Sequence, residues 1–292
     1  MRYNRSIFEI SKGEWAFHIP SLSTWLPTVV SLLEGKSVNL PEVQQQAVVN
    51  FIAPNGQVVD SERVLTGDYR GDVVGFVNCI GPMFKYSDLC TKGADRVVRE
   101  LQMLNSIDQV KSIILNIDGP GGSVSAVSLF QEFANQKQKP IVALVDLCAS
   151  AHYYASCLVA DHIMASNSIS AQIGSIGVMI SFADNRKYLE EKGYVFHEIY
   201  APESEHKNES FRLAREGKYE LIQEEMLSPT AKKFQNAVRQ ARPNLVEATG
   251  VLTGKTFEAE KALEYGMIDS IGNLQKAVQV AMMLAETKRV TQ

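Results

Sequence analysis

The chain has 292 residues, of which 45% are hydrophobic and 21% are charged. This length and composition suit one large globular domain, or one and a half, with a sizeable buried core. The formal net charge of −4 gives no electrostatic support for binding to a nucleic acid, so we expect no nucleic-acid partner.

The first 70 residues differ from the rest and predict an N-terminal extension ahead of a main domain over residues 71–292. This part holds both tryptophans, Trp15 and Trp25, and is punctuated by prolines. A helix is predicted over residues 41–49, and the Asn55-Gly56 pair predicts a tight hairpin turn. A propeptide, a substrate-gating arm and an assembly arm all remain open for the extension.

From residue 72 onward, apolar runs of strand length alternate with helical patterns. The alternation predicts a layered α/β fold. The predicted strands are 73–77, 112–117, 141–145 and 194–200, and the predicted helices are 86–104 and 220–242, the second ended by Pro243.

A Pro-Gly-Gly turn, Asp118 to Ser123, follows the apolar run 112–117 directly. Glycine is needed where the backbone approaches a ligand closely. Consecutive amides at a strand-to-helix turn can bind a negatively charged oxygen. The amides of Gly121 and Gly122 are therefore candidate donors of an oxyanion hole.

Ser150 lies at the predicted start of a helix of small residues, just after the strand 141–145. A serine at this position lies at a helix N-terminus and faces an open cleft, and both features suit a nucleophile. Its own amide is a further candidate oxyanion donor. Ser175, in the glycine-flanked segment 171–179, ranks second as a candidate serine and is predicted to be a structural turn residue or a hydrogen-bond partner of the base.

A serine hydroxyl needs an adjacent base, and histidine is the usual one. None of the five histidines pairs with an aspartate in a pattern that suggests a triad. Their positions are His18, His152, His162, His197 and His206. We predict structural roles for His152, which follows Ser150 by two positions and points to another helix face, and for His162 and His197 in strands.

The four cysteines, Cys79, Cys90, Cys148 and Cys157, show no C-x-x-C spacing and no histidine partners at metal-site distances. They are predicted to be buried small hydrophobic residues in a reducing compartment, and neither a metal nor another cofactor is expected.

In combination and order, these segments resemble the serine–lysine peptidases of the signal peptide peptidase A type, which include the head-maturation proteases of tailed phages. The resemblance runs from about Gly71 to Ala285. It rests on the Pro-Gly-Gly turn, on Ala149-Ser150-Ala151-His152-Tyr153-Tyr154, on Gly174-Ser175-Ile176-Gly177-Val178, and on Ser204-Glu205-His206-Lys207. Two departures are that Ala151 and His152 replace the usual glycines, and that Gly119 stands where serine is common.

The resemblance implies the spiral of β-β-α units shared with caseinolytic proteases and crotonases. It implies Ser150 as nucleophile and Lys207 as general base, with an oxyanion hole from Gly121, Gly122 and Ala151. Ser175 and His206 would support the pair. A lysine acts as a base only when neutral, and burial in an apolar pocket can lower a lysine pKa by several units.

The resemblance also implies a peptide or protein substrate and a homo-oligomer, with capsid, portal or scaffold proteins as partners of a phage-type enzyme. The apolar stretches are shorter than a membrane span, and the N-terminus lacks an apolar signal region. These features predict a cytoplasmic protein, and the resemblance implies association with the procapsid.

Four alternatives remain. One is signal peptide peptidase-like degradation of peptides. A caseinolytic protease would need a histidine base downstream of the serine, where this chain has Gly174-Ser175-Ile176. A crotonase would bind an acyl-CoA thioester in the same oxyanion hole, using acidic residues. The last is a non-catalytic shell, which is a peptidase-like scaffold used for assembly. The presence of both Ser150 and Lys207 argues against it.

Overall fold

The computed structural model describes residues 14–17, 49–87, 91–182 and 184–291. Its main feature is a nine-stranded sheet in the order β11-β9-β7-β5-β4-β2-β3, with β8 beside β7 and β12 beside β8. The bounds are β2 (Asn50–Ile52), β3 (Val58–Val59), β4 (Val73–Ile80), β5 (Val110–Gly119), β7 (Ile141–Ala149), β8 (His162–Ala165), β9 (Gln172–Gly174), β11 (Thr256–Glu258) and β12 (Ser270–Ile271).

The central strands β4, β5 and β7 are parallel, with Val77 opposite Leu115 and Leu115 opposite Ala143. A parallel strand is covered on both faces, which explains why these segments are continuous apolar runs. Three strands predicted from those runs are confirmed, each extended by a few residues. The strand predicted over 112–117 continues to Gly119, so the Pro-Gly-Gly turn starts inside the sheet.

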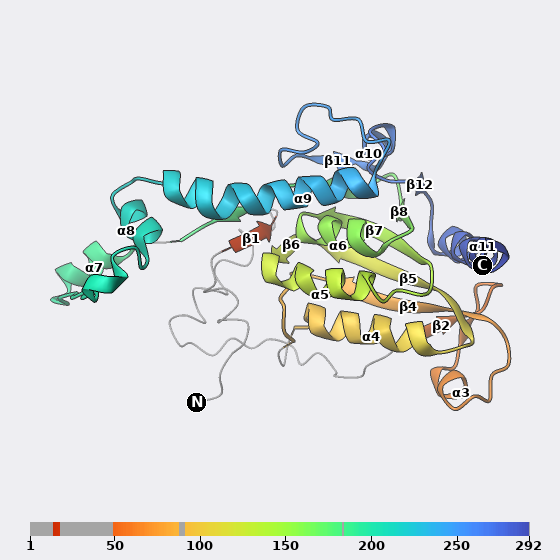
Figure 1. The fold of residues 1–292 in the computed structure, drawn as a ribbon. Coiled ribbons are helices and arrows are strands. Elements are labelled where there is room, and N and C mark those ends of the chain that lie inside the picture. The colour runs from red at the N-terminus through yellow and green to blue at the C-terminus, as the bar shows by residue number, and fades with distance from the viewer. Residues whose placement is uncertain (1–13, 18–48, 88–90, 183, 292) are drawn as a thin grey trace.

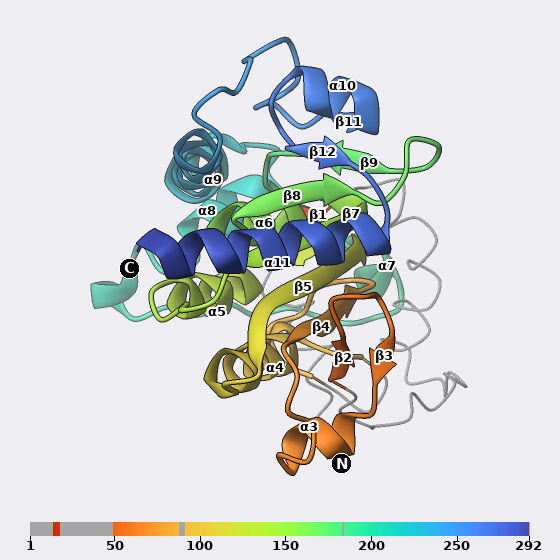
Figure 2. The ribbon, with the colours of Figure 1, turned by 90° about the vertical axis from the view of Figure 1, so that its right-hand side faces the viewer.

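Helices cover both faces of the sheet (Figures 1 and 2). One face carries α4 (Ala94–Ser106), α5 (Val124–Ala134), α6 (Ala151–Val159) and α9 (Ser228–Ala241), and the other carries α11 (Leu274–Thr291). Successive side chains of β5 point to opposite faces of the sheet. Ile113 and Leu115 belong to the larger hydrophobic core, whereas Ile114 packs on the other face in the smaller core that includes α11. The predicted layered α/β architecture is confirmed.

The hairpin predicted at Asn55-Gly56 is confirmed as β2 paired with β3, and Gly56 has a φ of 87°. β2 also pairs with β4, and Phe51 is fully buried in the main core. The helix α3 (Ser61–Leu65) follows β3. Part of the predicted extension is thus built into the main sheet. The helix predicted over 41–49 lies outside the described residues but for Val49.

The helix predicted over 86–104 is wrong at its start, because α4 begins at Ala94. The preceding segment caps the helix instead of joining it. The amides of Ala94 and Asp95 donate to carbonyls of Phe84 and Lys85, and the Asp95 carboxylate accepts hydrogen bonds from Ser87. These contacts satisfy first-turn amides that have no acceptor within the helix.

The segment between β10 (Met179–Ile180) and α9 forms an arm that projects from the body of the protein (Figure 1). It contains α7 (Arg186–Glu191), η1 (Pro202–Ser204), α8 (Glu209–Arg215) and the π-helix η2 (Ile222–Leu227). The strand predicted over 194–200, which included His197, is wrong. Val195 and Ile199 are 75% and 93% exposed, and no strand in the described chain pairs with this stretch.

The helix predicted over 220–242 is confirmed, and it ends at Ala241 ahead of Pro243. Its first part is the π-helix η2, which lies just before Pro229. Proline lacks an amide hydrogen and its ring clashes with the carbonyl four residues earlier, so a wider turn is expected at this position.

A second, small sheet has the order β10-β1-β6. Its outer strands are β10 and β6 (Gly121–Ser123), and the middle strand is β1 (Glu14–Phe17). β1 is antiparallel to both neighbours. In the described parts of the chain, no helix is long and apolar enough to cross a membrane.

Candidate active site

Ser150 lies between the end of β7 and the start of α6, as predicted, and acts as the N-cap of the helix. Its backbone has φ 58° and ψ −116°, and the residue is 1% exposed. A non-glycine residue at such angles is strained and persists only where its surroundings fix it. A strained strand-to-helix turn of this kind presents the nucleophilic serine in α/β-hydrolases.

Two carbonyls of the segment after α6 hold this serine. The Ser150 amide donates to the Gly174 carbonyl at 2.8 Å, and the Ser150 Oγ donates to the Gly177 carbonyl at 3.4 Å. The amide of Ser150 is therefore already partnered. The long bond leaves the hydroxyl weakly held. The glycines that flank this segment are recognisable in the sequence, but the roles of the Gly174 and Gly177 carbonyls are not.

Two aromatic residues anchor α6 and so fix the position of Ser150. The buried Tyr153 hydroxyl donates to the Met267 carbonyl at 2.8 Å. The Tyr154 ring stacks on Phe234 of α9, with ring centroids 4.3 Å apart. The strained turn is thus supported from the C-terminal part of the chain.

The Pro-Gly-Gly turn lies next to the serine turn, since Gly119 of β5 is paired with Cys148 of β7. Met83 holds one edge of β6: its amide donates to Gly121 at 2.8 Å and its carbonyl accepts from Ser123 at 2.9 Å. A Cβ at Gly122 would lie 1.9 Å from the Met83 carbonyl oxygen. That backbone contact leaves no room for any side chain at position 122.

His152 occupies one of the predicted oxyanion donors. The Gly121 amide donates to His152 Nδ1 at 2.9 Å in a buried position. Burial lowers the pKa of His152 to about 3, so the ring is neutral and its Nδ1 is an acceptor. Its Nε2 has no partner in the described chain. His152 therefore holds the Pro-Gly-Gly turn in place and is not positioned to act as a base for Ser150. The sequence predicted a structural role for His152 but not this hydrogen bond.

The Ala151 amide is the best placed of the predicted oxyanion donors. It is the first residue of α6, and amides of a first helical turn have no acceptor within the helix. The Gly122 amide lies on the edge of β6 that is paired with β1.

Gly119 and His152, one residue from each of the two departures from the family pattern, are physically coupled. A Cβ at position 119 would lie 2.3 Å from His152 Cε1, 2.5 Å from its Nε2 and 2.6 Å from the Gly81 carbonyl oxygen. The serine that is common at position 119 therefore cannot coexist with the histidine ring where it lies.

We expect Gly119→Ser to lower the free energy of unfolding by about 1–3 kcal/mol, because it overpacks the wall of the site. In a His152→Ala background the same change should cost at least about 1 kcal/mol less. Denaturant unfolding of the four proteins measures this coupling. Gly177→Ser is the control, since a Cβ there meets nothing within 4 Å. Equal costs in both backgrounds would contradict the coupling.

Lys207 and His206 lie on the arm between η1 and α8, away from α6 (Figure 1). The Lys207 side chain is exposed and makes no hydrogen bond with the described residues. The His206 ring is 77% exposed and contacts the carboxylates of Glu205 and Glu209. Within one chain, the structure does not bring Lys207 to Ser150. Ser175, 8% exposed with φ 54°, lies beside the site, and its amide donates to the Lys255 carbonyl.

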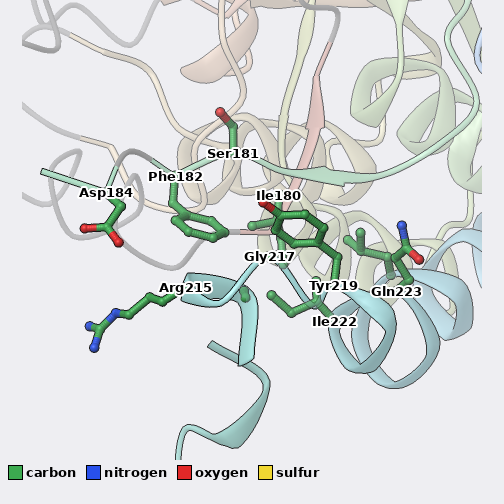
Figure 3. A pocket seen from close by; sticks show the side chains of 11 residues that line it. Ile180, Ser181, Phe182, Asp184, Arg215, Gly217, Tyr219, Ile222 and Gln223 are labelled. Carbon is green, nitrogen blue, oxygen red and sulfur yellow. The ribbon is translucent and has the colours of Figure 1, made fainter. Parts of the chain in front are cut away.

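A cavity of about 610 Å³ lies between β10 and the arm, and Ser150 does not line it (Figure 3). Ile180, Phe182, Arg215, Tyr219 and Ile222 are among the residues that line it.

Three cysteines, Cys79, Cys148 and Cys157, are free and buried as predicted, whereas Cys90 lies outside the described residues. Burial raises the pKa of the Cys79 and Cys157 thiols to about 12 and raises that of Cys148 as well. High pKa values make these thiols poor nucleophiles. The described residues contain no cluster of side chains suited to a metal ion.

Comparison with known proteins finds two family patterns in this chain. Residues 133–288, more than half of the chain, match Peptidase family S49, and residues 72–161 match Clp protease. The second match covers the strands and helices that carry the Pro-Gly-Gly turn and Ser150, and it confirms the predicted caseinolytic-protease-like fold.

Individual proteins agree with these matches. The chain is 26% identical to the head-tail preconnector protein GP5 of Enterobacteria phage P21, over 85% of this chain and 51% of that protein. It is 26% identical to Protease 4 of Haemophilus influenzae, over 70% of this chain and 33% of that protein. The chain thus spans about half the length of the first relative and a third of the second.

Among solved structures, a mutant of the 1510-N membrane-bound stomatin-specific protease with a substrate peptide aligns at 17% identity, with a TM-score of 0.46. The alignment covers 70% of this chain and 77% of that one. The match over more than half of the sequence, with Ser150 in a strained turn beside Pro-Gly-Gly, shows that the chain belongs to peptidase family S49.

Proposed function

We propose that the protein is a serine endopeptidase in which Ser150 attacks the peptide carbonyl and Lys207 is the general base. The observation that carries the proposal is the strained backbone of Ser150 at the N-terminus of α6, next to the glycine turn. This geometry presents a hydroxyl beside backbone amides, as acyl transfer requires.

In the proposed reaction, the Ser150 hydroxyl gives its proton to the neutral Lys207 amine while Oγ bonds to the substrate carbonyl carbon. The carbonyl oxygen becomes an oxyanion, stabilised by the Ala151 amide at the start of α6. The tetrahedral intermediate then expels the peptide amine, which takes the proton from Lys207. Water attacks the acyl-enzyme with the same base, releasing the acid and restoring Ser150.

A histidine mechanism of the caseinolytic-protease kind lacks its base in this chain. Ser175 occupies the neighbourhood downstream of Ser150, and the nearby His152 is buried, with Nδ1 already accepting the Gly121 amide. A crotonase-like acyl-CoA enzyme remains the second candidate, because its oxyanion hole would use the same turn.

The arm supports the proposal that the protein works as a homo-oligomer. Its exposed apolar side chains are unusual for a monomer surface and suit burial against another copy. They include Tyr188, Tyr194, Val195, Ile199 and Tyr219, each at least half exposed. Another copy would also bring a second Lys207 into the assembly.

The similarity to the preconnector protein of phage P21 supports a role in the phage head. We propose capsid, portal or scaffold proteins as substrates or partners, and association with the procapsid. Degradation of peptides in the manner of signal peptide peptidases is the alternative.

Hydrolysis of casein and of fluorogenic peptides, measured beside hydrolysis of acyl-CoA thioesters, tests the proposed function. We expect cleavage of peptides and none of thioesters, in both cases compared with the Ser150→Ala variant. Thioester turnover without peptide cleavage would replace the peptidase by a crotonase-like enzyme.

A further inference from the structure

The strand β1 lies between β10 and β6, two segments that lead to the Ser150 turn, and Figure 1 shows it beside β6. On one side is β6, which is part of the Pro-Gly-Gly turn. On the other is β10, which begins two residues after Gly177, the acceptor of the Ser150 hydroxyl. β1 comes from the distant N-terminus and fills the space between two strand edges that have no other neighbour on that side in the described chain.

We propose that Glu14–Phe17 of the chain itself is an internal competitor of the substrate, because it fills, as a strand between β6 and β10, the position that an extended peptide would take on the acyl side of the scissile bond. The proposal rests on the proposed peptidase function. Recognition would be by strand addition, in which backbone hydrogen bonds supply the affinity.

The hydrogen bonds of β6 leave one edge for such a strand. The Gly121 carbonyl and the Ser123 amide face Met83. Because hydrogen-bonding groups alternate along a strand, the amide and carbonyl of Gly122 face the opposite side, toward β1. Gly122 is paired with Ala16 there. The same alternation directs the amide and carbonyl of Trp15 toward Met179, its partner in β10.

The direction of β1 is the one that an acyl group needs. β1 is antiparallel to β6, so its carboxyl end, Phe17, lies opposite Gly121 at the turn. On the other side Trp15 is opposite Met179, and continuing this register by two residues places Phe17 opposite Gly177. Both edges therefore lead the carboxyl end of β1 toward the Ser150 turn.

The opposite end of β1 leads toward the cavity in Figure 3. Glu14 is the partner of Ile180, and Ile180 also lines that cavity of about 610 Å³. A bound peptide would thus have room for a side chain upstream of the residues that pair with β6 and β10. Backbone pairing tolerates many sequences, so this cavity is where selection among peptides would arise.

A proline in β1 tests the proposal, because it removes an amide hydrogen from the ladder. The comparison is Ala16→Pro against Ala16→Ser, which keeps the amide, both in a Ser150→Ala background that cannot cleave. The probe is a fluorescent peptide with the sequence of residues 11–20, and the measurement is its Kd by anisotropy. A scrambled peptide is the control, and thermal unfolding checks that both variants fold.

We expect the peptide to bind the Ala16→Pro protein at least about fivefold more tightly than the Ala16→Ser protein, and the scrambled peptide to show no difference. With Ser150 present, Ala16→Pro should lower the KM for peptide substrates and leave kcat nearly unchanged. Equal Kd values, or no binding to either variant, would overturn the proposal. The Kd measurement does not depend on catalysis. If the peptide binds as expected but the protein with Ser150 cleaves no peptide, the proposed function is refuted while the peptide-binding position between β6 and β10 stands.

Discussion

Replacing Ser150 by alanine is expected to abolish peptide cleavage, with a loss of at least about 10⁴-fold in kcat, while the unfolding temperature stays nearly the same. Alanine keeps the Cβ and therefore the same backbone strain at φ 58°. It removes only a hydroxyl whose hydrogen bond to the Gly177 carbonyl is 3.4 Å long. Initial rates on a fluorogenic peptide and a thermal melt measure the two quantities.

Ser175→Ala is the matched control, because Ser175 is also a nearly buried serine at positive φ beside the site. It should keep most of the activity. If the Ser150→Ala protein were active and the Ser175→Ala protein inactive, Ser175 and not Ser150 would be the nucleophile.

Replacing Lys207 by arginine is expected to inactivate the enzyme, although the positive charge is kept. A guanidinium does not give up its proton near neutral pH, so it cannot accept one from a serine hydroxyl. Lys218→Arg is the control, since Lys218 lies on the same arm and pairs with Glu216. It should keep its activity, as should His206→Ala, in which an exposed ring is removed.

The position of Lys207 on the arm adds a second measurement. If Lys207 is the base, either the arm moves or another copy supplies the lysine, because the arm of one chain lies away from α6. Mixing inactive Ser150→Ala and Lys207→Ala proteins should restore activity if the lysine comes from another copy, and not if the arm moves. Full activity of Lys207→Arg with loss of activity in His206→Ala would instead identify a histidine base.

The sequence predicts those parts of the fold that depend on local pattern. The buried parallel strands were recognisable because both of their faces are apolar, and the turn and serine motifs follow directly from them. The start of α4 was not recognisable, because contacts from Ser87 and Phe84 replace the first helical turn. The prediction of a strand over residues 194–200 is wrong because apolar residues on an exposed arm can show the same sequence pattern as a strand.

Within the site, the sequence placed Ser150 and the glycine turn but not the relations between them. That Gly119 leaves the space for His152, and that His152 accepts the Gly121 amide, depends on how β5 and α6 meet. The insertion of β1 between β6 and β10 joins segments more than one hundred residues apart. No local pattern specifies such pairings.

The most direct test of the central claim is covalent labelling by a fluorophosphonate, which reacts with an activated serine hydroxyl. Intact mass and peptide mapping of the treated protein locate the adduct. We expect one adduct on Ser150, absent from Ser150→Ala and strongly reduced in Lys207→Arg. An adduct on another serine, or an unlabelled protein that still cleaves peptides, would contradict it.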